Sequence, residues 1–270
     1  MTRLAALPAS SADRDIAVVI PALNEASSIR AVVQDALAHC PRVIVVDDGS
    51  EDDTAARVAD LPVTVLRHKY RLGKGAALRS GFAEALRQGC RGVLTMYGDG
   101  QHAASDLPRL LAAAATHPDC IVIGARLQRR AQQPWPRRMA NEFGDWGIAW
   151  ACGYRIADTQ SGQRYYPAAV CRLGDVPGED FVFEAQLLIS AARELGFGVV
   201  SVPIESRYRG DHGQNFRPSH FRPLRDLYRI TRHVVVQVLS RGRVVQAYRH
   251  CRANAPRIHD PRGDLATPPH

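Results

Sequence analysis

Short apolar runs alternate with amphipathic segments from residue 16 to about residue 125. Five of the runs have the length and the β-branched content of buried strands, and they cover residues 16–20, 43–46, 63–66, 92–96 and 121–123. Between them, apolar residues recur at helical spacing over residues 26–39, 53–61, 75–88 and 106–115. Fully apolar strands that alternate with amphipathic helices predict an α/β fold, with a mostly parallel sheet covered by helices on both faces.

The rest of the chain continues this pattern with longer polar stretches between the elements. We expect helices over residues 137–152, 181–195 and 223–239, and one more strand over residues 199–204. The C-terminal helix carries an apolar stripe of Leu224, Tyr228, Thr231, Val235 and Val238 beside a row of Arg222, Arg225, Arg229 and Arg232. A basic amphipathic helix of this kind is typical of binding to a membrane surface, and equally of packing on a sheet with a solvated edge. Trp135, Trp146 and Trp150 allow the same two interpretations, an interfacial contact or a place in the core.

Length and composition limit the organisation of the chain. Its 270 residues, 46% of them hydrophobic, are enough for one large domain or two small ones. We expect a flexible segment over residues 1–15, one domain over 16–210, a basic amphipathic extension over 211–250 and a disordered tail over 251–270. The sequence has no run of about 18 apolar residues and no signal-peptide pattern in residues 1–15. The six cysteines form no Cys-x-x-Cys pair, so we expect reduced thiols and a cytoplasmic location.

The positive charge is concentrated near the C-terminus. The formal net charge is +8, and residues 205–270 hold 13 arginines and 5 acidic residues, whereas the first 204 residues are balanced. This concentration predicts attraction to an anionic partner. A nucleic-acid binder is one alternative, but it leaves the carboxylates at the strand ends without a role.

Polar side chains follow three of the predicted strands. They are Asn24 and Glu25 after the first, Asp47 and Asp48 after the second, and Asp99 and Gln101 after the fourth. Open α/β sheets bind their ligands at the carboxyl ends of the strands. Asp99 and Gln101 stand in a glycine-flanked turn and offer oxygens that suit a hard divalent cation bridging phosphates. Each turn alone is also compatible with an Asp-Gly turn or a helix cap; their repetition at equivalent strand ends favours ligand binding.

A glycine-flanked lysine, Lys74, opens the helix predicted over residues 75–88. Backbone amides at a helix N-terminus, together with the lysine charge, can hold a phosphate. The segment is not a Walker A loop, because His68 and Gly75 stand where that motif needs glycine and Ser or Thr. No Gly-x-Gly-x-x-Gly follows the first strand, which argues against a dinucleotide-dependent dehydrogenase.

In their order and spacing, these motifs resemble those of the family 2 glycosyltransferases, which have the GT-A fold. The segments are Pro-Ala-Leu-Asn-Glu at 21–25, Val-Asp-Asp-Gly-Ser at 46–50, Leu-Gly-Lys-Gly at 72–75 and Gly-Asp-Gly-Gln-His at 98–102. The resemblance is greatest to the branch that uses dolichyl and polyprenyl phosphate, whose Asp-x-x-x-Gly-Phe-Arg segment resembles residues 158–164. Residues 219–223, Ser-His-Phe-Arg-Pro, resemble bacterial members of lipid and aryl-polyene pathways.

The resemblance implies a nucleotide-diphosphate sugar, linked to UDP or GDP, and a divalent metal, Mg²⁺ or Mn²⁺. On the family's pattern, the donor is bound by Pro21, Asn24, Glu25, Asp47, Asp48, Lys74 and Asp99, and the metal by Asp99 and Gln101. Two positions depart from that pattern, because Tyr97 replaces the first Asp of Asp-x-Asp and Gln186 replaces a Glu. A phenol does not replace a carboxylate at neutral pH, since its proton leaves only near pH ~10.

The implied reaction is an inverting displacement at the anomeric carbon, with the metal stabilising the departing diphosphate and Asp99 as a catalytic residue. A hydroxyl acceptor needs a base, for which Glu184 is the candidate, with Asp180 behind it. A lipid phosphate needs no base, and Arg126, Arg164 and Arg207 would neutralise it. The alternatives are ordinary surface ion pairs for the arginines and a solvated first-turn position for Glu184.

We therefore expect a metal-dependent glycosyltransferase that acts on a lipid-linked acceptor, peripherally at the inner face of the plasma membrane and without nucleic acid. One alternative is a relative that retains nucleotide or lipid binding but has lost turnover together with its two carboxylates. A sugar nucleotidyltransferase is less favoured, because no Gly-rich, Arg-containing loop follows the first strand.

Overall fold

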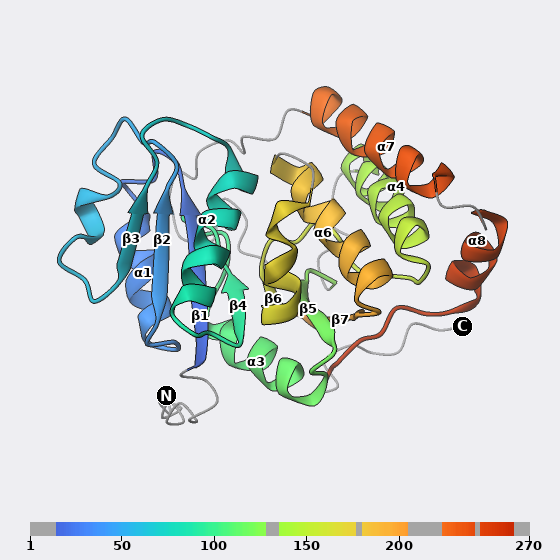
Figure 1. Cartoon of the computed structure of the whole chain (residues 1–270), viewed down its shortest axis with the longest axis horizontal. Coiled ribbons are helices and arrows are strands. Elements are labelled where there is room, and N and C mark those ends of the chain that lie inside the picture. The colour runs from blue at the N-terminus through green and yellow to red at the C-terminus, as the bar shows by residue number, and fades with distance from the viewer. Residues whose placement is uncertain (1–14, 128–134, 177–179, 205–222, 241–243, 262–270) are drawn as a thin grey trace.

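A seven-stranded sheet forms the centre of the molecule (Figure 1). The computed structural model describes residues 15–127, 135–176, 180–204, 223–240 and 244–261. The strands are β1 (Ile16–Ala22), β2 (Val43–Asp47), β3 (Thr64–Arg67), β4 (Gly92–Thr95), β5 (Cys120–Ala125), β6 (Arg164–Pro167) and β7 (Gly198–Pro203), in the order β3-β2-β1-β4-β6-β5-β7. Only β6 runs antiparallel to its neighbours within this sheet. The predicted mostly parallel α/β architecture is confirmed.

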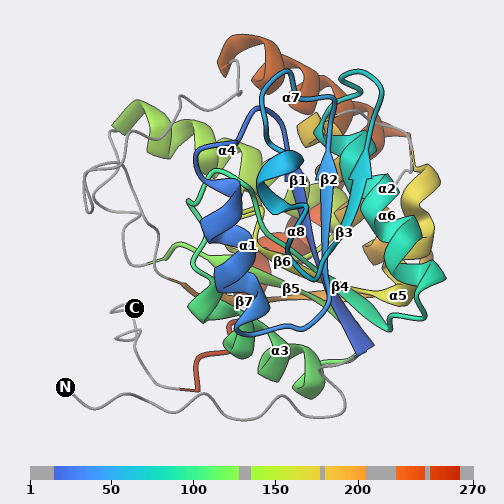
Figure 2. The ribbon, with the colours of Figure 1, turned by 90° about the vertical axis from the view of Figure 1, so that its left-hand side faces the viewer.

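Helices cover both faces of this sheet (Figure 2). They are α1 (Ile29–Leu37), α2 (Lys74–Arg87), α3 (Leu107–Thr116), α4 (Trp135–Cys152), α5 (Ala168–Cys171), α6 (Asp180–Glu194), α7 (Pro223–Leu239) and α8 (Val244–Ala253). The 3₁₀ turns η2 (Ala56–Val58), η3 (Ala104–Asp106) and η5 (Arg172–Asp175) accompany them. None of the helices in the described part of the chain is long and apolar enough to cross a bilayer.

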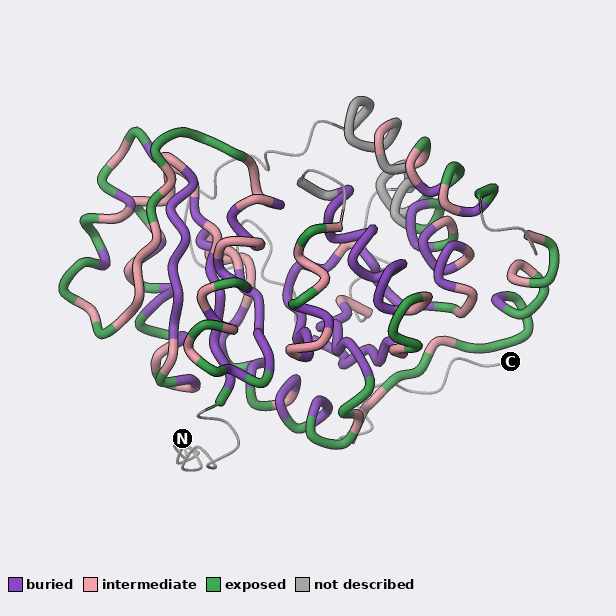
Figure 3. The backbone as a smooth tube through the Cα atoms, viewed as in Figure 1, coloured by how far each residue is buried: buried purple, intermediate pink, exposed green. Residues whose placement is uncertain are grey.

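Alternate side chains of each strand feed two separate cores. In β1, Ile16, Val18 and Ile20 pack with the α1 and α3 side, whereas Ala17 and Val19 pack with the α2 and α6 side. Because both faces of the central strands are buried, β1, β2, β4 and β5 are mainly apolar, and Figure 3 shows a buried centre of the molecule.

Helix α2 approaches β1 closely. A Cβ atom on Gly81 would lie 2.4 Å from Cγ1 of Val19, so only glycine allows this approach. The close packing fixes the N-terminal end of α2, and with it Lys74, relative to the strand ends.

The structure corrects the sequence prediction over residues 53–61. The expected helix is only the short turn η2, in which Val58 is the buried residue. Asp52 accepts a hydrogen bond from the Thr54 backbone N–H at 3.0 Å, a local bond that competes with helix formation. The short strand β6 and the helix α8 were not predicted either.

The chain after residue 250 also differs from the expected disordered tail. Cys251 is buried, α8 ends at Ala253, and residues 257–259 then run beside β7. The N–H of Ser201 donates to the carbonyl of Arg257 at 2.9 Å, and the N–H of His259 donates to the carbonyl of Ser201 at 2.8 Å. This segment therefore occupies the edge of the sheet. The expectations for residues 1–14 and 262–270 lie outside the described residues.

Candidate active site

The loops after β1 and β2 are joined at the carboxyl edge of the sheet. The Asn24 N–H donates to Ser50 Oγ at 2.9 Å, and Asn24 Oδ1 accepts from the Glu51 N–H at 2.9 Å. The Glu25 N–H donates to Thr54 Oγ1 at 2.8 Å. Asn24 has a φ of 57°, a left-handed conformation that asparagine adopts more readily than most residues. These side chains build one rigid surface from two strand ends.

Pro21 lies inside β1, where the sequence pattern predicted that the strand would stop. The pairing of β1 with β2 continues to Ala22, but the pairing of β1 with β4 ends at Val19. A proline, which has no N–H, is tolerated where a strand loses one of its partners.

Asp47 and Asp48 are both buried at the end of β2. Asp47 accepts from the Ser50 N–H at 2.9 Å, and Arg67 Nε lies 3.2 Å from its other oxygen. This carboxylate holds the turn after β2 in place. A direct contact with the donor stays a prediction.

Asp48 organises the segment that leads into α2. It accepts from the N–H groups of Leu72 and Gly73 at 2.9 and 2.7 Å, and His68 Nδ1 lies 2.7 Å from the same carboxylate. His68 Nε2 lies 2.9 Å from Ser80 Oγ on α2. In this structure both oxygens of Asp48 thus position the loop before Lys74.

Lys74, Tyr97 and Glu184 form a partly buried cluster between α2, the turn after β4 and α6, and Glu184 is its buried member. Lys74 Nζ donates to the Tyr97 hydroxyl at 3.0 Å, and that hydroxyl donates to Glu184 at 3.0 Å. Lys74 and Glu184 are also paired directly. Burial raises the pKa of the Glu184 carboxyl, but the charges of Lys74 and Arg164 outweigh burial and hold that pKa below its ordinary value. Glu184 is therefore an ionised partner of Lys74.

Tyr97 is a neutral phenol in this cluster. Burial, followed by the negative charge of Glu184, raises the pKa of the Tyr97 hydroxyl well above its usual value. A protonated phenol is a poor ligand for a cation, so Tyr97 does not replace the missing carboxylate of the metal motif.

The turn after β4 presents Asp99 and Gln101. The Gln101 N–H donates to Asp99 Oδ1 at 3.0 Å, and Ser28 Oγ donates to the carbonyl of Gly98 at 2.7 Å. Within the described residues, no group of three or more His, Cys, Asp or Glu side chains is placed to hold a metal ion. Asp99 and Gln101 still fit such an ion, because Mg²⁺ in phosphate-binding sites needs only one or two carboxylates and takes its other oxygens from phosphates and water.

His102 supports this turn from inside. Its Nδ1 accepts from the Tyr97 N–H at 3.2 Å, and the two rings lie 4.7 Å apart. Burial, and then the charge of Arg126, lower the pKa of His102 to about 3. The imidazole is therefore neutral, and the backbone bond assigns its proton to Nε2.

The segment 158–164 forms the opposite wall of the site. The Arg126 guanidinium binds Asp158 with two bonds of 2.7 Å, and Asp158 has a left-handed φ of 54°. Asp145 on α4 accepts from both the N–H and the hydroxyl of Thr159, at 2.7 and 2.6 Å. Arg126 thus lies at the site, where the sequence predicted it, but the structure pairs it with Asp158.

The predicted contact between Arg164 and an acceptor phosphate is not supported. Arg164 is buried on β6 and donates to the carbonyls of Ser161 and Thr159, both at 2.6 Å, and to the Tyr166 hydroxyl at 3.1 Å. Its side chain is buried in the protein and holds the 158–164 segment through the two backbone carbonyls.

Three further predicted residues complete the comparison. Asp180 is the first residue of α6, but its side chain lies outside the described residues, as does Arg207. Gln186 lies two residues beyond Glu184, and its side-chain oxygen is 2.6 Å from Nε2 of His233 on α7. Gln186, which stands where the family's pattern has Glu, therefore connects α6 to α7.

Sequence reasoning missed the roles of His102, Asp145 and His68. His102 was visible as the last residue of the metal motif, and its place after a glycine-rich turn was the available signal. His68 and Asp145 carry no such signal, because their partners lie on elements that are distant in sequence.

The chain is similar to a family model and to several characterised proteins. The Glycosyl transferase family 2 model matches residues 17–172. Polyprenol monophosphomannose synthase of Mycolicibacterium smegmatis is 33% identical over 201 residues, which cover 69% of this chain and 75% of the relative. Undecaprenyl-phosphate mannosyltransferase of Micrococcus luteus is 31% identical over 202 residues, which cover 70% of this chain and 82% of the relative.

Solved structures support the same fold. Glucosyl-3-phosphoglycerate synthase of Mycobacterium tuberculosis, in complex with Mn²⁺, UDP-glucose and phosphoglyceric acid, superposes with a TM-score of 0.61 at 24% identity. The match covers 84% of this chain and 79% of that one. The sheet, the motifs at its carboxyl edge and the family match agree, and the chain belongs to glycosyl transferase family 2, as an enzyme of the GT-A fold.

Proposed function

We propose that the protein transfers a sugar from a UDP- or GDP-sugar to a polyprenyl phosphate, with inversion at the anomeric carbon. The observation that carries the proposal is the pairing of Glu184 with Lys74 and Tyr97. A hydroxyl acceptor needs a base, and a carboxylate with a lowered pKa and two donors is a weak one. A phosphate acceptor is already an anion and needs no base. The relatives named for polyprenol and undecaprenyl phosphate support the same acceptor class.

In this mechanism, Asp99 and Gln101 hold a divalent cation, which supplies charge stabilisation to the departing diphosphate. Lys74, at the N-terminus of α2, adds a second positive charge on the donor side. Arg126, paired with Asp158, would be an arginine that meets an anionic acceptor.

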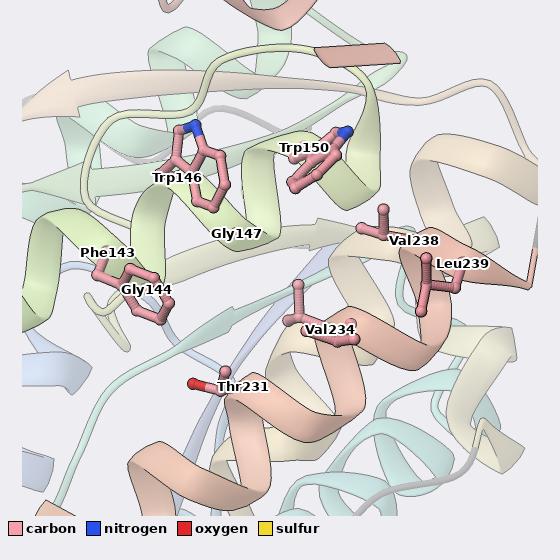
Figure 4. A pocket seen from close by; sticks show the side chains of 10 residues that line it. Phe143, Gly144, Trp146, Gly147, Trp150, Thr231, Val234, Val238 and Leu239 are labelled. Atoms are coloured by element: carbon pink, nitrogen blue, oxygen red, sulfur yellow. The ribbon is translucent and has the colours of Figure 1, made fainter. Parts of the chain in front are cut away.

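The acceptor lipid would meet the protein at the helical end of the molecule. Helices α4 and α7 enclose a groove of about 180 Å³, into which Phe143, Trp146, Trp150, Val234 and Val238 point (Figure 4). Trp146 and Leu239 at its rim are 41% and 66% exposed. Exposed basic residues accompany these apolar ones, namely Arg232 on α7 and Arg249 and Arg252 on α8. Aromatic and apolar groups beside arginines are typical of binding to an anionic membrane surface, and we place the protein at the cytoplasmic face.

The matched acceptors polyprenyl phosphate and polyprenol test the chemistry. The purified chain, a panel of UDP- and GDP-sugars and Mn²⁺ are incubated with either acceptor, and the labelled lipid product is measured. We expect transfer to the phosphate and none to the alcohol. Equal transfer to both acceptors, or to neither, would contradict the proposal.

A relative with weakened turnover is the second candidate, favoured by the uncharged residues Tyr97 and Gln186. The double substitution Tyr97→Asp and Gln186→Glu restores both carboxylates of the family's pattern. A large gain in turnover supports this candidate, whereas little change supports an enzyme that is intact as it stands.

A further inference from the structure

The residue at position 97 changes the charge of the metal turn. In the Asp-x-Asp pattern this position carries a carboxylate, and here it carries a partly buried phenol. The Tyr97 hydroxyl lies 3.0 Å from both Lys74 Nζ and a Glu184 oxygen. Lys74 Nζ also lies 4.9 Å from the centre of the Tyr97 ring. The turn therefore has one negative charge fewer than the pattern, and an ammonium stands beside the position of the missing one.

Tyr97 fits its surroundings closely. A Cβ atom on Gly162 would lie 2.0 Å from the Tyr97 ring, so glycine is required for this ring position. The Gly162 carbonyl accepts a hydrogen bond from Thr95 Oγ1 at 2.7 Å, and the His102 ring lies tilted against the Tyr97 ring, 4.7 Å between centres. The phenol is thus a built part of the site, and Lys74 is held where it is by two partners.

This arrangement has opposite effects on the two ligands of the donor site. A divalent cation alone meets Asp99 as the carboxylate of this turn, because the other nearby carboxylate, Glu184, is already paired with Lys74. A diphosphate is attracted by Lys74 and by the N-terminal end of α2. The cation therefore gains the missing negative charge only from the diphosphate, whereas the diphosphate meets Lys74 and the N-terminal end of α2 already in place.

We propose that Tyr97 and Lys74 set the order in which the donor site is assembled: the nucleotide diphosphate binds first, without metal, and the divalent cation is held only together with it. Tyr97 acts here as a positioning residue for Lys74. The inference rests on the proposed donor class, and it concerns binding, so it is tested without turnover.

The experiment measures the two ligands separately on the full chain. Binding of UDP and of GDP is measured by calorimetry in EDTA, and binding of Mn²⁺ by electron paramagnetic resonance, with and without the nucleotide. Mn²⁺ with nucleotide in protein-free solution is the reference. We expect one of the nucleotides to bind in EDTA, and Mn²⁺ alone to bind at least about tenfold more weakly than it does with that nucleotide.

Tyr97→Asp and Tyr97→Asn form the matched pair of variants. Both remove the ring and leave the same space, and they differ only in charge. We expect Tyr97→Asp to bind Mn²⁺ alone about tenfold more tightly than Tyr97→Asn, and to bind the nucleotide in EDTA more weakly. Equal affinities in the two variants overturn the inference, as does wild-type protein that binds Mn²⁺ alone as tightly as with nucleotide.

A second variant covers the case in which the loss of the ring prevents folding. Lys74→Met keeps Tyr97 and removes only the ammonium, so it should bind the nucleotide in EDTA about tenfold more weakly and Mn²⁺ alone more tightly. Unchanged affinities in this variant overturn the inference as well. Wild-type protein that binds neither UDP nor GDP in any condition overturns the proposed donor class and this inference with it, whereas nucleotide binding that strictly requires Mn²⁺ overturns the inference alone.

Discussion

The two ends of the molecule are built from different interactions. At the carboxyl ends of β1, β2 and β4, polar groups bind one another, as Asn24 does with Ser50 and Asp48 with the loop before α2. At the helical end, α4, α7 and α8 instead leave aromatic and aliphatic side chains exposed around a groove. The first region is a frame of polar side chains that bind one another, and the second leaves apolar side chains exposed as far as the described residues go. On the proposed function, we therefore predict that donor chemistry and acceptor recruitment can be separated by substitutions in the two regions.

The largest expected effect separates chemistry from recruitment. Asp99→Asn removes the one carboxylate of the metal turn, so we expect kcat/KM to fall by about 10²–10³-fold. Binding to vesicles should stay unchanged, because Asp99 lies in the turn after β4 and does not line the groove between α4 and α7. Initial rates and vesicle sedimentation measure the two properties. A parallel loss of both would show that the two regions are coupled.

A substitution of Arg164 on β6 tests how strongly this buried side chain supports the 158–164 segment. Arg164→Met leaves the buried carbonyls of Ser161 and Thr159 without their donor, and we expect the free energy of unfolding to fall by about 3–5 kcal/mol. Urea denaturation measures this change. The control is Tyr154→Phe, which removes one buried hydroxyl bonded to the Phe197 carbonyl and should cost only about 1 kcal/mol. Equal losses in the two variants would mean that Arg164 is not a special support of the 158–164 segment.

The groove is tested by a pair of polar substitutions. Trp146→Ser combined with Leu239→Ser removes two exposed apolar side chains, and we expect binding to phosphatidylglycerol vesicles to weaken by about tenfold or more. Affinity for the nucleotide should not change. Tyr70→Ser is the control, since Tyr70 is about as exposed as Leu239 but lies in the loop before Lys74. Vesicle binding that responds to Tyr70 and not to the groove would contradict the proposed membrane face.

The smallest effect concerns the contact between α6 and α7. Burial lowers the pKa of His233, so its protonation on acidification is less favourable in the folded than in the unfolded protein. The stability that the neutral imidazole provides is present above the ordinary pKa of histidine and is lost as the pH falls below it. We expect His233→Gln to lose less of its unfolding free energy than the wild type between pH 7 and pH 5. Denaturation curves at the two pH values measure the difference.

The sequence predicted the polar frame better than the helical end, and the reason is geometric. Asn24, Asp48 and Asp99 follow parallel strands, whose carboxyl ends necessarily meet at one edge, so local patterns were enough to bring them together. Lys74 and Glu184 are 110 residues apart, and their pairing depends on how α6 packs against α2. No local pattern contains that information.

Burial was the second property that the sequence did not reveal. Arg164 looks like a phosphate ligand in a polar segment, yet the antiparallel strand β6 turns it into the core beside Tyr166. The Arg-Tyr-Tyr-Pro segment is too short and too polar for the pattern of a buried strand. The same limit hid the structure of residues 251–261, whose Pro, His and Arg content is typical of a tail but whose backbone pairs with β7.

That pairing has a consequence for how the protein is made. The free edge of β7 offers unpaired backbone groups to any other strand, and such edges are starting points for aggregation. Residues 257–259 cover it, but they follow β7 by more than fifty residues and leave the ribosome later. During synthesis the sheet is therefore exposed to incorrect partners until this segment arrives. Variants or fusions that hinder residues 257–259 should reduce the yield of soluble protein even though no residue of the active site has changed.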